Sequence, residues 1–244
     1  SPVLRGLPPP GRTDPTIPGP DHDRRMNHVG GLSYSMMQAG AALGSVLVAL
    51  AGLGISNYLY DRGVSNYLSR KVGHVFGGLA YLVAVLWMEF PIALGLATAS
   101  FLLFVGLRVF NDRMLRGVGG SARRHTYAEV TYAFAGALSI GVGWGVFGDK
   151  WLAFVPIGFM AFGDSITGVV RSLIYEKEVK GLWGSAAMLG VCLLVALLYH
   201  PYWVGAVGAM VATGAEKLSP IATGWVDDNW LLTGASLGAM AMLR

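Results

Sequence analysis

Three carboxylates in this sequence stand within or at the edge of long apolar segments, where a charge is costly. Asp164 lies inside the apolar segment 151–170, and Glu129 and Glu216 lie near the ends of two others. A carboxylate in a membrane-spanning helix costs several kcal/mol unless it is paired or hydrated, so all three are candidates for a functional site. The alternative for Asp164 is a structural role, in which it marks a helix kink and pairs with Arg171. The alternative for Glu129 and Glu216 is that they are hydrated carboxylates at the membrane interface.

A short acidic run opens the last apolar segment, where Asp227, Asp228 and Asn229 follow one another. Acidic residues suit a helix N-terminus electrostatically, and capping alone explains one of them. Two acids and an amide in succession also offer the oxygen ligands that Mg²⁺ prefers. We therefore predict a Mg²⁺ site with Asp164, Asp227 and Asp228 as its ligands.

Two cations stand at the start of another apolar segment. Arg70 and Lys71 precede His74 by about one helical turn. Alone, the two cations would be a membrane-topology anchor, since positive residues concentrate on the cytoplasmic side. Their pairing with a histidine one turn inside the helix indicates a binding or catalytic role instead.

A third cation precedes a pair of small residues. Lys180 is followed by Gly184 and Ser185, which open an apolar segment. Free backbone N–H groups at a helix N-terminus bind phosphate, so this segment is a candidate for nucleotide binding. The alternative is a small pair that lets two helices approach closely.

The elements that must position these residues are apolar helices. The chain has 244 residues, of which 54% are hydrophobic and 13% charged, whereas soluble domains carry roughly 25% charged residues. About twenty apolar residues in a helix match a hydrocarbon core of about 30 Å. We predict an all-α, polytopic integral membrane helix bundle of about eight transmembrane helices with short loops, seven or nine being the alternatives. The expected spans are 36–55, a hairpin over 72–107, 128–147, 151–170, two within 181–215 divided at His200-Pro201, and 229–243.

Prolines and charges suggest the organisation around these spans. Residues 1–25 hold seven of the eleven prolines, so we expect 1–29 to be an extended arm and 30–244 a single transmembrane catalytic domain. With eight spans, 12 of the 18 Lys and Arg fall on one face, which is therefore expected to be cytoplasmic and to hold the active site. The membrane would be the cell membrane of a prokaryote, or the endoplasmic reticulum of a eukaryote.

Several classes of function are disfavoured. The net charge of +4 comes from residues between apolar segments, which favours topology signals over a nucleic-acid surface. The single Cys192 cannot form a disulfide or a cysteine-ligated zinc site within one chain. The sequence has no G-x-x-x-x-G-K-[ST] motif, no G-x-G-x-x-G after a strand and no H-E-x-x-H motif.

Five short blocks share one order and one predicted face. They are Arg70-Lys71-Val72-Gly73-His74, Gly163-Asp164-Ser165-Ile166-Thr167-Gly168, Lys180 with Gly184-Ser185, Glu216, and Asp227-Asp228-Asn229. Together they resemble the polyprenol kinase family, which groups dolichol kinases, phytol kinases and CTP-dependent diacylglycerol kinases, over roughly residues 66–240. The block at 163–171 resembles archaeal members, whereas the segment 180–185 lacks a hydroxyl and an acid that many members have.

The resemblance implies a kinase that uses Mg²⁺ and transfers the γ-phosphate of CTP to the hydroxyl of a polyprenol- or dolichol-type lipid alcohol. The partners expected are this alcohol, the nucleotide and membrane lipids, without nucleic acid. The residues expected to be catalytic are Asp164, Lys71, His74 and Glu129, with the general base open among Asp164, Glu129 and His74. The residues expected to bind the nucleotide are Arg70, Gly163, Ser165, Thr167, Arg171, Lys180, Gly184, Ser185, Glu216 and Asn229.

Two other functions fit parts of the pattern. A CTP-dependent cytidylyltransferase that makes a CDP-lipid would also use a Gly-Asp span with cations and carboxylates at the cytoplasmic face, but it breaks a different phosphate bond. A transporter or a non-catalytic membrane subunit would use intramembrane acids to carry protons or ions. Polar groups on both faces, or in a line across the bilayer, would indicate transport, whereas here the polar groups are expected on one face.

Overall fold

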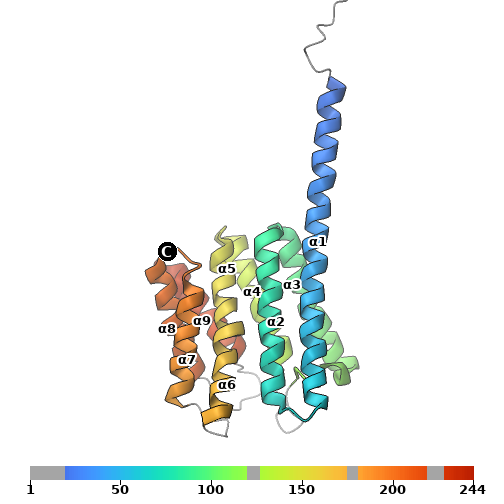
Figure 1. The fold of residues 1–244 in the computed structure, drawn as a ribbon. Helices are drawn as coiled ribbons and strands as arrows, with labels where there is room; N and C mark the ends of the chain where they lie inside the picture. Colours follow the sequence, from blue (N-terminus) through green and yellow to red (C-terminus); the bar gives the residue numbers. More distant parts are fainter. Residues whose placement is uncertain (1–19, 120–126, 175–180, 219–227) are drawn as a thin grey trace, which may run out of the picture.

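The computed structural model describes residues 20–119, 127–174, 181–218 and 228–244, and within these ranges the chain is helical apart from short turns. Eight helical rods pack side by side as one bundle (Figure 1), which confirms the all-α prediction for the described residues. The first segments are α1 (Pro20–Asp61), α2 (Asn66–Trp87), α3 (Phe90–Phe110) and the short 3-10 helix η1 (Asp112–Leu115). Two rods consist of consecutive segments: α4 (Ala128–Ser139) continues as the π-helical η2 (Ile140–Val146), and α5 (Lys150–Gly158) continues as the π-helical η3 (Phe159–Gly163) and then as α6 (Asp164–Ile174). The last three helices are α7 (Leu182–Ala196), α8 (Tyr202–Leu218) and α9 (Asp228–Leu243).

The breaks between helices fall where the sequence predicted them. The hairpin over 72–107 turns at Glu89, and Pro91 lies in the first turn of α3, where its missing N–H leaves no helical bond unmade. Gln38 of α1 closes this turn, because its Nε2 donates to the carbonyl oxygen of Trp87 at 3.1 Å and its Oε1 accepts from the backbone N–H of Glu89 at 2.9 Å. The segment 181–215 divides around His200-Pro201 into α7 and α8.

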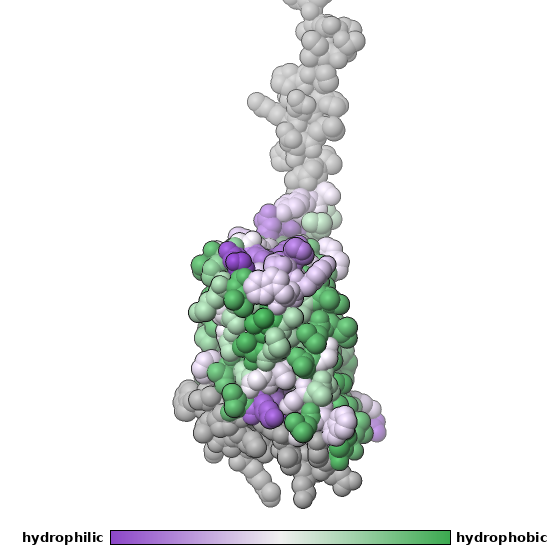
Figure 2. Space-filling view, turned by 90° about the vertical axis from the view of Figure 1, so that its left-hand side faces the viewer, coloured by the Kyte–Doolittle hydropathy of each residue, from purple (hydrophilic) through white to green (hydrophobic). Residues whose placement is uncertain are grey.

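Three helices are long and apolar enough to cross a membrane. They cover Ser33–Asp61, Phe90–Phe110 and Lys150–Ile174, and they coincide with the predicted first, third and fifth spans. α7 is also apolar but has 15 residues, fewer than the roughly 20 that a bilayer core requires. Figure 2 shows apolar residues across the middle of one face, with hydrophilic residues gathered above them. Eight membrane spans stay a prediction.

The first helix is longer than predicted. α1 begins at Pro20, so residues 20–29, expected to be extended, are helical. A proline at the first helical position has no unmade hydrogen bond and its fixed φ suits a helix, so the last proline of the arm does not prevent helix formation. α1 projects well beyond the other helices (Figure 1). The extended conformation expected for residues 1–19 lies outside the described residues.

The rod formed by α5, η3 and α6 is the core of the bundle. Leu152, Phe154, Ile157 and Phe159 are fully or almost fully buried in it. A π-helical segment, Phe159–Gly163, directly precedes Asp164, where α geometry resumes, and such π segments are frequent at functional sites. The central rod therefore carries the predicted key carboxylate between α2 on one side and the C-terminal helices on the other.

Candidate functional site

Lys71, His74 and Asp164 form a buried polar cluster where α2 meets α6. The Nζ of Lys71 donates a hydrogen bond to Oδ2 of Asp164, and Nδ1 of His74 lies 3.7 Å from the same oxygen. Lys71 and His74 are three residues apart and therefore share one face of α2. The structure thus brings together three of the four residues for which a catalytic role was predicted.

Small and hydroxyl residues of α6 allow this contact. A Cβ on Gly168 would lie 2.9 Å from Cγ of Lys71, so glycine lets the lysine side chain cross α6. The Ser165 hydroxyl donates to the backbone oxygen of Lys71 at 3.1 Å, and the Thr167 hydroxyl donates to the backbone oxygen of Asp164 at 2.7 Å. In this structure Ser165, predicted to bind nucleotide, links α6 to α2, and Thr167, also predicted to bind nucleotide, bonds within α6.

A group of three carboxylates extends the cluster toward α8 and α9. One carboxylate oxygen each of Asp164, Glu216 and Asp228 lies within 4.8 Å of the other two, and Asp164 and Glu216 are buried. These hard oxygen donors fit Mg²⁺, which takes one or two carboxylates and keeps places for water and phosphate. Glu216, predicted to bind nucleotide, belongs to this group, and the predicted ligand Asp227 lies outside the described residues.

Arg171 joins the carboxylate group to the aromatic face of α2. Its Nη2 donates to Oε1 of Glu216 at 2.8 Å, and its Nη1 donates to the Tyr67 hydroxyl at 3.4 Å. A Cβ on Gly184 would lie 3.1 Å from Nε of Arg171, so the start of α7 passes closely over the guanidinium. The alternative in which Arg171 pairs with Asp164 is wrong, because each residue has another partner.

Glu129, the fourth predicted catalytic residue, lies apart from the carboxylate group. It stands in the first turn of α4, is buried, and faces Nη1 of Arg108 on α3 at 3.4 Å. Tyr132, one turn further along α4, donates its hydroxyl hydrogen bond to the backbone oxygen of His74 at 2.8 Å, and its ring centroid lies 4.5 Å from that of the imidazole. Tyr132 thus contacts His74 from α4, whereas Asp164 faces Nδ1 of the same imidazole from α6.

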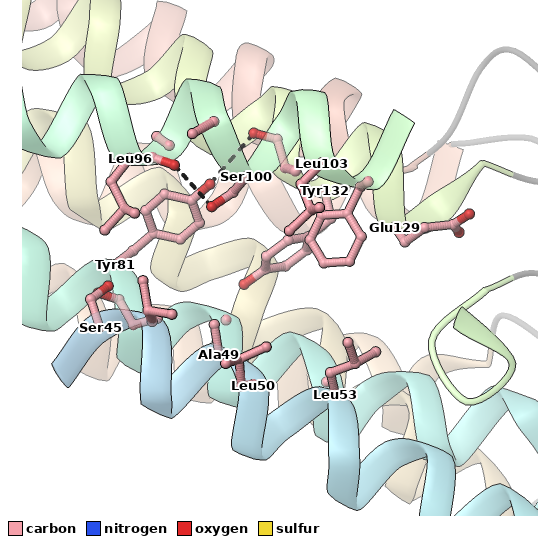
Figure 3. Close-up of a pocket in the computed structure, with 18 of the residues that line it drawn as sticks. Ser45, Ala49, Leu50, Leu53, Tyr81, Leu96, Ser100, Leu103, Glu129 and Tyr132 are labelled. Carbon is pink, nitrogen blue, oxygen red and sulfur yellow. Dashed lines mark hydrogen bonds between the residues drawn. The ribbon is translucent and has the colours of Figure 1, made fainter. Parts of the chain in front are cut away.

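An elongated cavity of about 370 Å³ begins beside His74 and Glu129 and runs between α1, α2, α3 and α4. Figure 3 shows Glu129 at one end, Tyr132 next to it, and Tyr81 with Ser45 and Leu96 toward the other end. Most of the lining is apolar. The polar cluster therefore borders a long apolar space on one side and the carboxylate group on the other.

The remaining predicted residues have mainly structural contacts. Asn229 is buried and donates through Nδ2 to the backbone oxygen of Ala128 at 3.0 Å, which ties α9 to α4. Gly163 packs against Cys192, whose Sγ would lie 2.4 Å from a Cβ at that position. The Cζ of Arg70 lies 6.0 Å from the ring centroid of Tyr67. Ser185 has a buried hydroxyl at the start of α7, without a hydrogen-bond partner among the described residues.

The predicted nucleotide ligand Lys180 lies outside the described residues. Arg108, Tyr67 and Tyr132 were not predicted as site residues, because arginine near a span end is expected for topology and aromatic residues are common in apolar helices. A G-x-S-x-G motif at 234–238 was also missed. It lies inside α9, where the Ser236 hydroxyl donates to the backbone oxygen of Leu232 at 2.8 Å, so it is not a nucleophile turn.

No protein-family model, curated protein or solved structure matches this chain. The likeness to polyprenol kinases therefore rests on the five sequence blocks and on the chemistry of the residues that they bring together.

Proposed function

We propose that this chain is an integral membrane lipid kinase that transfers the γ-phosphate of CTP to the hydroxyl of a polyprenol- or dolichol-type alcohol. The observation that supports this most is the contact of Lys71, His74 and Asp164 beside the carboxylates of Glu216 and Asp228. Phosphoryl transfer requires charge neutralisation and positioning more than covalent catalysis, and this group of cations and carboxylates offers both.

The proposal includes a bundle of eight membrane-spanning rods with its active site at the cytoplasmic face. In its support, the site residues come from α6 and from the ends of α2, α4, α8 and α9 that lie at the lower end of the bundle in Figure 1. The three apolar helices are long enough to cross a bilayer. Among the described residues of the predicted Lys and Arg excess, Arg62, Arg116 and Lys217 stand at or just beyond helix ends on this side.

His74 is the proposed general base. In the reaction the alcohol oxygen forms a bond to the γ-phosphorus, the bond from that phosphorus to the β–γ bridging oxygen breaks, CDP leaves, and the hydroxyl proton passes to Nε2 of His74. A carboxylate facing Nδ1 favours the tautomer in which Nε2 is the proton acceptor. Asp164 accepts a hydrogen bond from Lys71 and Glu129 faces Arg108, so both are weaker bases than an imidazole nitrogen.

The remaining charged groups would hold the nucleotide. Lys71 and Arg171 supply positive charge next to the carboxylate group. At the start of α7, Gly184 supplies a first-turn backbone N–H and Ser185 supplies its hydroxyl, whereas the backbone N–H of Ser185 already donates to the carbonyl oxygen of Gly181 at 3.3 Å. Mg²⁺, held by Asp164, Glu216 and Asp228, would neutralise phosphate charge when bound. CTP as the donor rests on the family resemblance alone.

The experiment is incubation of the purified protein with Mg²⁺, mixed polyprenols and CTP labelled separately at the α- and the γ-phosphate. A kinase places only the γ-label in lipid. The α-label in lipid, with release of pyrophosphate, would replace this proposal with a CDP-lipid synthase. Transfer of neither label, with ATP and diacylglycerol also supplied, would favour a non-enzymatic membrane subunit or a transporter.

The matched control is a pair of Asp→Asn substitutions. Asp164→Asn removes the buried carboxylate at the centre of the site and should abolish γ-label transfer. Asp112→Asn makes the same change at an exposed position on η1 and should leave transfer unchanged. Normal transfer in the Asp164→Asn variant would remove Asp164 from the proposed site.

A further inference from the structure

The cavity between α1 and α4 follows the helix axes over a long distance. On α2 its lining extends from Gly73 to Ala84 and on α3 from Ala93 to Leu107. At 1.5 Å per residue these stretches measure about 16 Å and about 21 Å, more than half of the roughly 30 Å hydrocarbon core of a bilayer. A ligand that fills the cavity is therefore long and lies along the helices.

The cavity opens sideways between α1 and α3. Leu50 of α1 and Leu103 of α3 line it and are nevertheless 54% and 56% exposed. Figure 3 shows these side chains on opposite sides of the space, one from each helix. In the proposed membrane orientation this opening faces lipid rather than water, so a ligand can pass into the cavity directly from the bilayer.

The hydroxyl groups along the cavity already have hydrogen-bond partners. Ser45 and Ser100 donate to the backbone oxygens of Ala80 and Leu96, both at 2.9 Å, and Tyr81 donates to the backbone oxygen of Ala133 at 3.4 Å (Figure 3). With these groups engaged in helix contacts, the walls behave as apolar surface. These hydroxyls keep only acceptor lone pairs for a ligand, because each hydrogen is donated to a backbone oxygen.

The end of the cavity nearest the polar cluster is different. His74 lines it and is 4% exposed, and its Nε2 is buried without a hydrogen-bond partner among the described residues. A buried polar atom without a partner is costly, and a ligand hydroxyl would satisfy it. The cavity is therefore matched to a molecule with one long hydrocarbon chain and a single polar group at its end.

We propose that this cavity binds the hydrocarbon chain of the acceptor alcohol, which enters from the bilayer between α1 and α3 and places its hydroxyl at Nε2 of His74. The volume of about 370 Å³ is near the lower limit of ligand pockets and accommodates one chain. The acceptor is accordingly a single-chain alcohol such as a polyprenol, not a diacylglycerol. That the bound alcohol is a phosphate acceptor rests on the proposed function.

The experiment uses the full chain in lipid nanodiscs and a long-chain isoprenoid alcohol with a diazirine at the end remote from its hydroxyl. After illumination, mass spectrometry should find the label on peptides of α1, α2 or α3 near Ser45, Ala84 and Ala93. Excess unlabelled polyprenol should abolish labelling, and excess diacylglycerol should not. Labelling elsewhere, no labelling, or equal competition by diacylglycerol would overturn the proposal.

Two nearby alanines of α1 provide a matched pair of variants. Both are exposed, but Ala49 lines the cavity and Ala51 does not. Ala49→Trp should lower labelling and phosphorylation by about tenfold, the effect of overfilling a fitted site, whereas Ala51→Trp should change neither. Equal effects of the two substitutions would contradict the proposed site.

The two proposals can fail separately. If the protein transfers no phosphate to any alcohol but the cavity is still labelled with the expected competition, the cavity is a single-chain lipid site and the kinase proposal is wrong. If phosphate transfer is normal but the label falls outside the α1–α4 cavity, the kinase proposal stands and the acceptor chain binds elsewhere.

Discussion

Lys71 of α2 and Asp164 of α6 are 93 positions apart in the sequence and form an ion pair whose side chains are only 4% and 3% exposed. A buried ion pair adds little net stability, because desolvation offsets the attraction, whereas loss of one partner leaves a charge that costs about 3–5 kcal/mol. The main consequence of this pair is positional. It holds one carboxylate between the imidazole of His74 and the oxygens of Glu216 and Asp228.

Lys71→Met should destabilise the protein and abolish phosphate transfer, and adding Asp164→Asn should restore most of the stability and none of the activity. Methionine is unbranched like lysine but carries no charge, so the single variant leaves Asp164 buried and unpaired. The free energy of unfolding should fall by about 3–5 kcal/mol. Chemical denaturation in detergent micelles measures stability, and transfer of the γ-label measures activity.

Lys217→Met is the control for this prediction, because Lys217 is exposed in the last turn of α8. It should change neither stability nor activity. If the double variant Lys71→Met/Asp164→Asn is as unstable as Lys71→Met alone, the loss of stability does not come from an unpaired charge on Asp164. Turnover by the double variant would exclude both residues from catalysis.

Glu216→Gln and Asp228→Asn should each weaken divalent-cation binding by roughly tenfold or more, a loss typical of altered metal sites. An amide keeps the size of the side chain but removes the negative charge that a hard cation prefers. Binding of Mn²⁺, as a paramagnetic substitute for Mg²⁺, can be titrated by electron paramagnetic resonance without any substrate. Unchanged Mn²⁺ affinity in both variants, with Asp112→Asn as the reference, would exclude the carboxylate group as a metal site.

The sequence predicted the helices better than the contacts between them. Turns near Glu89-Pro91 and His200-Pro201 follow from local proline chemistry and from the length of the apolar segments. The shared face of Lys71 and His74 follows from their spacing of three residues. Each of these predictions depends on residues close together in the chain, which is why the structure agrees with them.

The partners of the charged residues depend on packing that leaves no local pattern. Arg171 contacts Glu216, 45 positions away, although Asp164 is closer in sequence. Tyr132 contacts His74 across 58 positions, and nothing in its neighbourhood distinguishes it from other aromatic residues of apolar helices. The π-helical segment before Asp164 also has no recognisable sequence pattern, because the wider turn occurs inside a continuous helix.

Arg171→Lys should raise KM for the nucleotide by about tenfold, because the ammonium group of lysine cannot replace the planar, forked guanidinium of arginine. The guanidinium contacts Glu216 through Nη2 and Tyr67 through Nη1 at the same time, which one ammonium group cannot reproduce with the same geometry. Steady-state kinetics with varied CTP measures the effect. Arg113→Lys, an exposed position of η1, is the matched control, and equal KM values for the two variants would remove Arg171 from nucleotide binding.

Gly163→Ala should destabilise the bundle, and Cys192→Ala should partly reverse the effect in the same chain. The added Cβ would lie 2.4 Å from Sγ of Cys192 and 3.4 Å from Cγ of Met188, so α7 must move away from the central rod, at a cost of about 1–3 kcal/mol. Removing the sulfur makes room for the new methyl group. The two substitutions should therefore couple favourably by about 0.5–3 kcal/mol in a double-mutant cycle.

Gly190→Ala separates this contact from the general effect of alanine in a helix. Gly190 also lies on α7, and a Cβ there would meet nothing within 4 Å, so the substitution should be neutral or stabilising by up to about 1 kcal/mol. Because Gly163 directly precedes Asp164, a shift of α7 should also lower the rate of phosphate transfer, and the double variant should recover it. Strict additivity of the two substitutions in denaturation would mean that Cys192 does not limit the approach of α7 to Gly163.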